Sequence, residues 1–160
     1  MTRVAAIDCG TNSIRLLVAD GHIGEDGRPH LSDLTRQMRI VRLGQGVDAR
    51  GYLDPAAIER TVEATVEYQR MIEALGATRT RFVATSATRD ASNSTDFVRQ
   101  IKAVIGVEPE VVVGTEEASL SFNGAVSGLG ESVTAPMLVV DIGGGSTELV
   151  LGATRVEQAI

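Results

Sequence analysis

With 160 residues, 43% of them hydrophobic and 22% charged, the chain has the composition of one ordinary globular domain rather than that of a disordered or membrane-spanning protein. Its formal net charge of −6 argues against a nonspecific nucleic-acid surface, because phosphate backbones are bound through clustered Lys and Arg. We therefore expect no nucleic-acid partner, although a local cluster of arginines and backbone N–H groups can still hold phosphate in an acidic protein.

The first 43 residues contain three predicted strands. Residues 4–7 and 13–19 are rich in β-branched and aliphatic side chains, and the turn-forming segment 8–12 separates them. This pattern predicts a β-hairpin. Residues 31–43 are bounded by glycine-containing segments on both sides and are predicted to add a third, antiparallel strand.

Helices and strands then alternate. Asp54 and Pro55 supply an N-cap and a first helical residue, apolar side chains follow at helical spacing, and Gly76 is the natural stop. The further elements predicted in this part of the chain are strands at residues 80–84 and 110–113 and helices at residues 94–105 and 115–126. The order β-β-β-α-β-α-β-α predicts an α/β, ribonuclease H-like domain with a mixed sheet over residues 1–128.

A second, similar domain is predicted to begin near residue 136. Residues 129–135 read as a linker, and residues 136–160 contain a strand, a glycine-rich loop and another strand. The chain ends 19 residues after Asp141, so we expect these to be the first strands of a truncated domain. Lacking the rest of their sheet, residues 137–160 are expected to be poorly ordered or to pair with another copy of the chain.

The loops of the two predicted hairpins repeat one another. Residues 8–13 (DCGTNS) align without gaps with residues 141–146 (DIGGGS), 133 positions later, and an apolar strand precedes each loop. A tight turn of this kind points several backbone N–H groups into one concavity that can hold phosphate oxygens, and the Asp at the strand end can hold Mg²⁺. The repeat predicts two phosphate-binding loops that face each other across a cleft between duplicated domains.

Four motifs follow one another along the chain: residues 8–15 (DCGTNSIR), 84–91 (ATSATRDA), 114–118 (GTEEA) and 141–148 (DIGGGSTE). In this order and spacing they resemble the signatures of the exopolyphosphatase/guanosine pentaphosphate phosphatase (Ppx/GppA) family, whose fold is shared with actin, sugar kinases and chaperone ATPases. The resemblance implies a hydrolase that releases terminal orthophosphate from inorganic polyphosphate or guanosine pentaphosphate, with Mg²⁺ as cofactor. We also expect a homodimer.

The resemblance implies a role for each candidate site residue. Glu117 matches the carboxylate that orients and deprotonates the attacking water, and Glu116 is the fallback if the register is off by one. Asp141 and Glu148 are implied Mg²⁺ ligands, direct or through water, and Asp8 is the matching carboxylate of the first loop. The implied phosphate-binding residues are Thr11, Asn12, Ser13, Arg15, Arg89, Gly143, Gly144, Gly145 and Ser146.

Simpler interpretations remain open for several of these residues. A helix dipole alone favours acidic side chains such as Glu116 and Glu117 in a first turn, and Glu148 and Arg15 could be exposed strand residues. At the level of function, the alternatives are an ATP-dependent sugar or acetate-type kinase of the same superfold, and a noncatalytic phosphate sensor or actin-like module. The GTEEA segment argues against the kinase.

The remaining features are predicted to carry no chemistry. Cys9 is the only cysteine and has no partner for a disulfide or a zinc site, so we expect a small buried residue in a reduced compartment. His22 and His30 match no motif and are predicted to lie at the surface. Because no apolar segment approaches the ~20 residues of a membrane span, we expect a cytoplasmic protein without a membrane partner.

Overall fold

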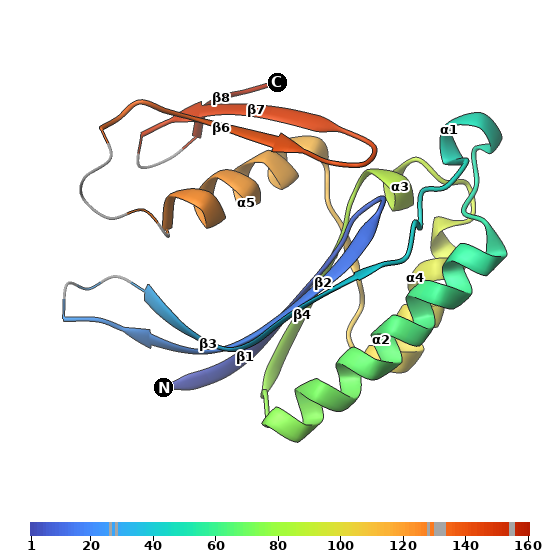
Figure 1. Ribbon diagram of the computed structural model, residues 1–160, viewed down its shortest axis with the longest axis horizontal. Coiled ribbons are helices and arrows are strands. Elements are labelled where there is room, and N and C mark those ends of the chain that lie inside the picture. Colours follow the sequence, from blue (N-terminus) through green and yellow to red (C-terminus); the bar gives the residue numbers. More distant parts are fainter. Residues whose placement is uncertain (26, 28, 128, 130–133, 154–155) are drawn as a thin grey trace.

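The computed structural model describes residues 1–25, 27, 29–127, 129, 134–153 and 156–160. Two sheets lie one above the other in Figure 1, and a single helix, α5, lies between them. Within the described part of the chain, no helix is both long and apolar enough to cross a membrane.

The larger sheet is mixed, as the sequence predicts. Its strand order is β3-β2-β1-β4-β5, with antiparallel pairing among the first three strands of the chain and parallel pairing of β4 with both β1 and β5. The strands are β1 (Thr2–Cys9), β2 (Ser13–Ile23), β3 (Pro29–Ile40), β4 (Arg79–Ala84) and β5 (Glu110–Val111). The last of these is shorter than expected.

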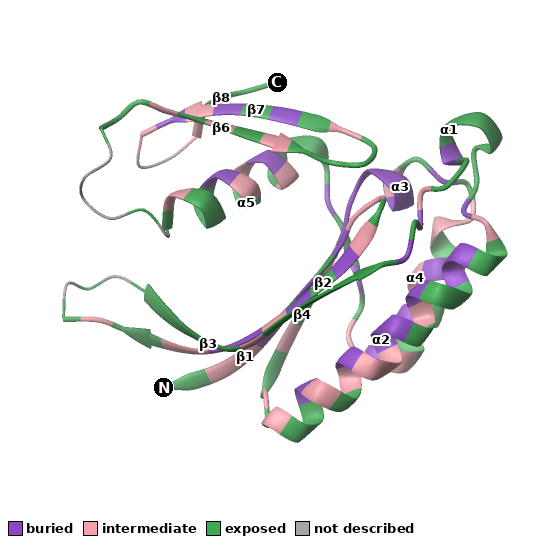
Figure 2. Ribbon diagram, viewed as in Figure 1, coloured by how far each residue is buried: buried purple, intermediate pink, exposed green. Residues whose placement is uncertain are grey.

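Two long helices, α2 (Pro55–Leu75) and α4 (Ser94–Ile105), cover one face of this sheet. The predicted start of α2 is confirmed, because the Asp54 side chain accepts a hydrogen bond from the Ala56 N–H at 2.9 Å. Gly76 ends the helix with a left-handed φ of 70°. Buried positions gather where the helices meet the sheet, whereas β3 is exposed along almost all of its length (Figure 2).

Alternation along β1 and β2 divides the sheet into a core face and an open face. Ala5, Ile7 and Cys9 are buried in β1, and β2 contributes Ile14 and Leu16 to the same core. The prediction that Cys9 is buried is confirmed. The intervening residues of both strands face away from the two helices, and the candidate site residues Asp8 and Arg15 lie opposite each other on this open face.

The smaller sheet is an antiparallel meander of β6 (Met137–Ile142), β7 (Thr147–Gly152) and β8 (Val156–Ala159). Its strands pair with one another, which corrects the expectation that residues 137–160 would be poorly ordered; their pairing with another copy of the chain stays a prediction. The strand β8 and the short helices α1 (Val47–Arg50) and α3 (Ser86–Arg89) were not anticipated.

The packing of α5 (Gly114–Ser127) also differs from the expectation. The sequence placed this helix in the first domain, yet its buried residues Ala118 and Phe122 form a separate small core with Val150 of β7. A sheet that exposes one apolar face needs a cover, and α5 is the cover for the second sheet. Residues 130–133 of the predicted linker lie outside the described residues, so the domain boundary after residue 128 stays a prediction.

Candidate active site

The two glycine-containing loops contain the same hydrogen-bonded turn. The Gly10 N–H donates to the Ser13 carbonyl oxygen at 3.0 Å, and the Gly143 N–H donates to the Ser146 carbonyl oxygen at 2.9 Å. The donors and the acceptors are separated by the same 133 positions as the sequence motifs. The repeat seen in the sequence is therefore also a repeat of the backbone.

The strands that flank the loops are also equivalent, but their side chains have diverged. Asp8 lies opposite Arg15 in the first hairpin, and Asp141 lies opposite Glu148 in the second. Asp8 thus faces a cation, with 3.7 Å between its Oδ2 and Arg15 Nη1. Asp141 instead accepts a hydrogen bond from the Ser121 hydroxyl of α5 at 2.7 Å.

The second loop lies directly against the first. A Cβ added to Gly144 would come within 2.9 Å of the Asn12 side chain, and one added to Gly145 would lie 2.6 Å from Thr11 Oγ1 and 2.9 Å from Ser86 Oγ. Such separations are shorter than side chains tolerate, so glycine permits the contact. Direct contact between the loops fixes one end of the space between the two sheets.

A segment that the sequence analysis assigned to a strand anchors the first loop. The prediction extended that strand to residue 43, but β3 ends at Ile40 because the next residues turn to bind the loop. The Val41 N–H donates to the Asn12 carbonyl oxygen at 3.0 Å, and the Gly44 N–H donates to that of Thr11 at 2.9 Å. A Cβ on Gly44 would lie 2.3 Å from Thr11 Cγ2, so this anchor requires glycine.

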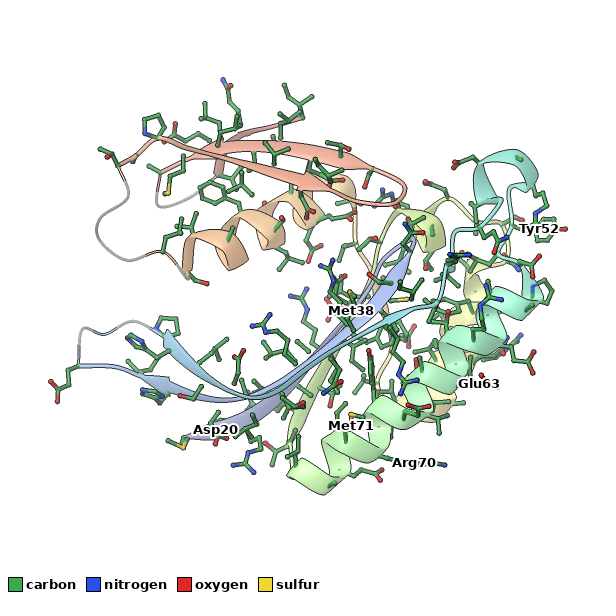
Figure 3. The ribbon with its side chains drawn as sticks, viewed as in Figure 1. Asp20, Met38, Tyr52, Glu63, Arg70 and Met71 are labelled. Atoms are coloured by element: carbon green, nitrogen blue, oxygen red, sulfur yellow. The ribbon has the colours of Figure 1, made fainter. Side chains whose placement is uncertain are left out.

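A cleft of about 920 Å³ lies between the open face of the first sheet, α5 and the second hairpin. Met38 of β3 projects into the space above the first sheet, whereas Glu63 and Arg70 project from the far side of α2 (Figure 3). Most of the predicted site residues line this cleft, namely Asp8, Thr11, Asn12, Ser13, Arg15, Glu117, Asp141, Gly143, Gly144 and Ser146. Arg89, Gly145 and Glu148 are outside the lining.

Glu117 is the best-placed candidate base. It lies in the first turn of α5, where 16% of its side chain is exposed, compared with 46% for Glu116. Burial raises the pKa of Glu117 above its ordinary value, and the negative charge of Glu148 adds to the rise. Hydrogen bonds from Arg89 and Thr85 act in the opposite direction. The geometry therefore favours Glu117 over the neighbouring Glu116 as the functional carboxylate.

Arg89 lies beside this carboxylate rather than in the open cleft. Its Nη1 donates to Glu117 Oε2 at 3.3 Å and to the Val112 carbonyl oxygen at 2.8 Å. The predicted role in phosphate binding stays a prediction. What the structure adds is a direct contact with the candidate base.

The proposed metal ligands are not gathered at one point. Among the described residues, no three Asp, Glu, His or Cys side chains are close enough to form a metal site by themselves. Glu148 is buried next to Glu117, while Asp8 and Asp141 face the cleft from opposite loops. Burial raises the pKa of Asp8, the charge of Asp141 raises it further, and Arg15 lowers it.

These residues fit the way in which proteins commonly hold Mg²⁺. The ion is usually bound by one or two carboxylates, with waters and substrate phosphate oxygens as the remaining ligands. Asp8 and Asp141 supply two carboxylates across the cleft, and the repulsion between them would be relieved by a cation. A dedicated three-residue cage is not needed for such a site.

Several polar residues that line the cleft were not predicted from the sequence. Thr85 and Ser86 fall within the quoted motif at residues 84–91, but no role was assigned to them. Ser121 follows Glu117 by four positions on α5, so helical periodicity could have placed both on one face. Arg81 and Val83 are two residues apart on β4, so the alternation of a strand places both on the same face, and this argument could have found Arg81.

Comparison with known proteins agrees with this arrangement. The profile of the Ppx/GppA phosphatase family matches residues 22–160. Exopolyphosphatase 2 of Mycobacterium tuberculosis is 53% identical over 161 residues, which cover 98% of this chain and 50% of that protein. The bifunctional 3-dehydroquinate synthase/phosphatase of Fusobacterium nucleatum is 34% identical over 150 residues, which cover 92% of this chain and 23% of that protein.

Solved structures show the same fold. An exopolyphosphatase-like protein with 45% identity superposes with a TM-score of 0.91, covering 99% of this chain and 49% of the other. The Ppx/GppA family member of Aquifex aeolicus has 34% identity and a TM-score of 0.81, covering 99% of this chain and 50% of its own. An exopolyphosphatase of Cytophaga hutchinsonii has 29% identity and a TM-score of 0.88, again with 99% and 49% coverage.

The predicted ribonuclease H-like, actin-like ATPase fold is thereby confirmed, and the ethanolamine utilization protein EutJ of Carboxydothermus hydrogenoformans shares it more distantly, at 18% identity and a TM-score of 0.53. The chain spans about half the length of the M. tuberculosis relative and of the solved structures compared above. From its sequence, its paired glycine loops and these matches, the chain belongs to the Ppx/GppA phosphatase family.

Proposed function

We propose that this protein releases terminal orthophosphate from inorganic polyphosphate by Mg²⁺-assisted attack of water. The observation that carries the proposal is the position of Glu117, a largely buried carboxylate with a raised pKa on the wall of a cleft that two glycine loops share. The names of the M. tuberculosis and C. hutchinsonii relatives support polyphosphate as the substrate. Those relatives are about twice as long as this chain. The activity is therefore proposed for the whole protein to which residues 1–160 belong.

The two loops would hold adjacent phosphates. Their turns use the N–H groups of Gly10 and Gly143, so the residues between turn donor and acceptor, at positions 11–12 and 144–145, are the candidate backbone donors. Thr11, Asn12 and Ser13 add hydroxyl and amide groups on the same side. Arg15 lines the cleft beside them and offers a guanidinium fork to a phosphate oxygen.

Glu117 would act as the general base. A water molecule next to its carboxylate gives up a proton to Glu117 while the water oxygen attacks the terminal phosphorus, and the bond from that phosphorus to the bridging oxygen breaks. The bridging oxygen leaves with its electron pair on the shortened chain. A carboxylate whose pKa is raised is a stronger base, and contact with Arg89 holds it in one orientation.

The charges around the cleft support a requirement for a cation. Asp8, Glu117, Asp141 and Glu148 are carboxylates, and a substrate made of phosphates would add more negative charge. Asp8 and Asp141 would hold Mg²⁺ together with waters and phosphate oxygens, and the ion would neutralise charge that develops on the transferred phosphoryl group. Glu148 would act through water or through its effect on Glu117.

Other aspects of the function remain predictions from the sequence. Guanosine pentaphosphate stays an alternative substrate, and the homodimeric state and cytoplasmic location stay expectations. A kinase of the same superfold would transfer phosphate from ATP to an acceptor hydroxyl, and a noncatalytic module would bind anions without releasing phosphate.

One assay separates these possibilities. The purified protein, carrying residues 1–160 with whatever its gene encodes beyond them, is given long-chain polyphosphate, guanosine pentaphosphate or ATP, each with Mg²⁺ or with a chelator. We expect Mg²⁺-dependent orthophosphate release that is greatest with polyphosphate and is lost in Glu117→Gln. Binding without release would favour the noncatalytic module, and release from ATP alone would overturn the proposed substrate.

A further inference from the structure

Arg81 is the centre of a joint between the two halves of the cleft: the ion-pair cluster of Arg81, Glu110 and Glu116, which connects the first sheet to α5. It projects from β4 of the first sheet, while the neighbouring α5 packs against the second sheet. We propose that Arg81 is a positioning residue for the reaction: by holding Glu116 it fixes the first turn of α5 and, with it, Glu117. This inference rests on the proposed function for its kinetic consequences, but the joint itself is a feature of the structure.

One end of the joint is rigid. Arg81 Nε contacts both carboxylate oxygens of Glu110 at 3.1 and 3.0 Å, and Nη2 reaches Glu110 Oε2 at 2.6 Å. Glu110 begins β5, which is held by parallel pairing with β4. The guanidinium is therefore fixed in place by two neighbouring strands of one sheet.

The other end reaches the helix. Arg81 Nη2 also donates to Glu116 Oε1 at 3.0 Å, and Glu116 is the residue directly before the candidate base. The N–H groups of Glu116 and Glu117 both donate to the Val113 carbonyl oxygen at 3.0 Å, so the two residues belong to the same first turn. Any movement of Glu116 would move Glu117 with it.

Few other contacts fix this turn to the first sheet. Val112 is hydrogen-bonded to Ala84 of β4, but the next residues, Val113 and Gly114, are exposed. The buried residues of α5 face the second sheet instead. In the described part of the chain, the start of α5 is thus linked by side chains to β4 and the residues that follow it through the Arg81–Glu116 pair, the Arg89–Glu117 pair and the hydrogen bond between Thr85 and Glu117.

Because the side chains of Arg81 and Glu116 are both partly exposed, a role in positioning Glu117 can be distinguished from a contribution to global stability. The side chains of Arg81 and Glu116 are 43% and 46% exposed, and ion pairs that are open to solvent add little to global stability. Losing the pair should therefore leave the fold intact while displacing the base. A misplacement of about 1 Å can cost a reaction about a hundredfold in rate.

The test is a double-mutant cycle in the full-length protein. Arg81→Gln, Glu116→Ala and the double variant are compared with wild type for kcat, KM and melting temperature. Arg79→Gln is the matched control, because it removes the same charge from the same strand two residues earlier. Glu116→Gln, which can still accept a hydrogen bond, serves as the conservative variant.

We expect each single variant to lower kcat about 10- to 100-fold with KM changed less than about threefold, and the double variant to be no worse than either single one. Melting temperatures should stay within about 2 °C of wild type. Glu116→Gln should keep more activity than Glu116→Ala, and Arg79→Gln should behave as wild type.

Two results would overturn the inference. Arg81→Gln could prove as active as Arg79→Gln, or it could raise KM while Glu116→Ala has no effect, which would make Arg81 a direct phosphate ligand. Hydrogen exchange of the amides of residues 115–118 gives a readout that needs no activity. Exchange there should be faster in Arg81→Gln and Glu116→Ala but not in Arg79→Gln. Unchanged exchange would reject the joint even if the wild-type protein released no phosphate.

Discussion

At the scale of single residues, Arg89 and Glu117 form the pair on which the proposed chemistry depends. Arg89 stabilises the ionised form of Glu117, so it lowers a pKa that burial and Glu148 raise. Removal of Arg89 should therefore raise the pKa of Glu117 further. Since the base acts only when ionised, the acid limb of the pH profile of kcat/KM should move to higher pH in Arg89→Ala.

Steady-state kinetics between about pH 5 and 9 test this prediction, with Arg99→Ala of α4 as a control that removes a distant exposed arginine. A loss of affinity for phosphate chains with no movement of the acid limb would contradict it. That outcome would return Arg89 to the phosphate-binding role that the sequence alone implies.

The same carboxylate should cost the protein stability. Because the pKa of Glu117 is raised in the folded state, the folded protein binds the proton more tightly than the unfolded chain does. Stability therefore falls as the pH rises from the unfolded pKa through the folded pKa, and the full cost is present once both are exceeded. Glu117→Gln should melt at a higher temperature than wild type at pH 7, and the difference should shrink as the pH falls towards about 4.

Thermal melts of the two proteins at several pH values measure the effect. A variant that is less stable than wild type at neutral pH would show that contact with Arg89 outweighs the burial of the charge.

At the scale of elements, the sequence predicted those parts whose signals are local. The start and end of α2 follow from Asp54, Pro55 and Gly76, and the two hairpins follow from apolar runs on either side of a turn. Partners distant in sequence were harder to predict. The apolar stripe of α5 shows that one face is buried but not which sheet buries it, and Ala118 and Phe122 turned out to face the second sheet.

The candidate site also contains residues that the sequence predicts and contacts that it does not. Asp8 and Asp141 could be found because a repeat marks them, and Glu117 because the resemblance supplies its role. The contacts of Arg81 and Arg89 depend on the packing of α5 against two sheets, and no periodicity in the sequence reports that. Short helices such as α3 have too few residues for a periodic signal.

Contact between the loops leads to a prediction for the glycine at position 145. In Gly145→Ala the new Cβ would meet Thr11 and Ser86, so the two loops should be forced apart. We expect kcat/KM for polyphosphate to fall about tenfold or more, the scale of an overpacking cost. Gly124→Ala in α5 is the matched control, because its Cβ would point into open space.

Kinetics and thermal melts of both variants provide the comparison. The control should keep full activity and gain stability of about 1 kcal/mol or less, since alanine favours a helix over glycine. Equal activity of the two variants would contradict close approach of the loops in the active state.

The small core behind α5 gives a further test. Phe122 is fully buried among Ala118, Val150 and their neighbours, and replacement by alanine in such a setting costs about 3–5 kcal/mol. If the two sheets have separate cores, Phe122→Ala should speed hydrogen exchange mainly in residues 114–160, leaving β1 and α2 protected. A uniform loss of protection would show that the two cores unfold as one unit.

At the scale of the whole molecule, the chain presents two copies of one hairpin on two sheets, with the candidate base Glu117 between them. The first hairpin belongs to a sheet with its own helices and core, whereas the second has α5 on one face and exposed Leu138, Val140 and Leu149 on the other. Together the two hairpins place their loops in contact and their strand-end aspartates across one cleft. The proposed chemistry therefore belongs to the junction of the two sheets.

In the proposed reaction, water activated by Glu117 attacks the terminal phosphorus. Phosphate release from long-chain polyphosphate in ¹⁸O-labelled water, by wild type and Glu117→Gln in parallel, tests it most directly. We predict one labelled oxygen in each orthophosphate that wild type releases, and a rate about 10²- to 10⁴-fold lower for Glu117→Gln with substrate binding near normal. Orthophosphate that carries no label, or a Glu117→Gln variant that releases it at the wild-type rate, would contradict the account.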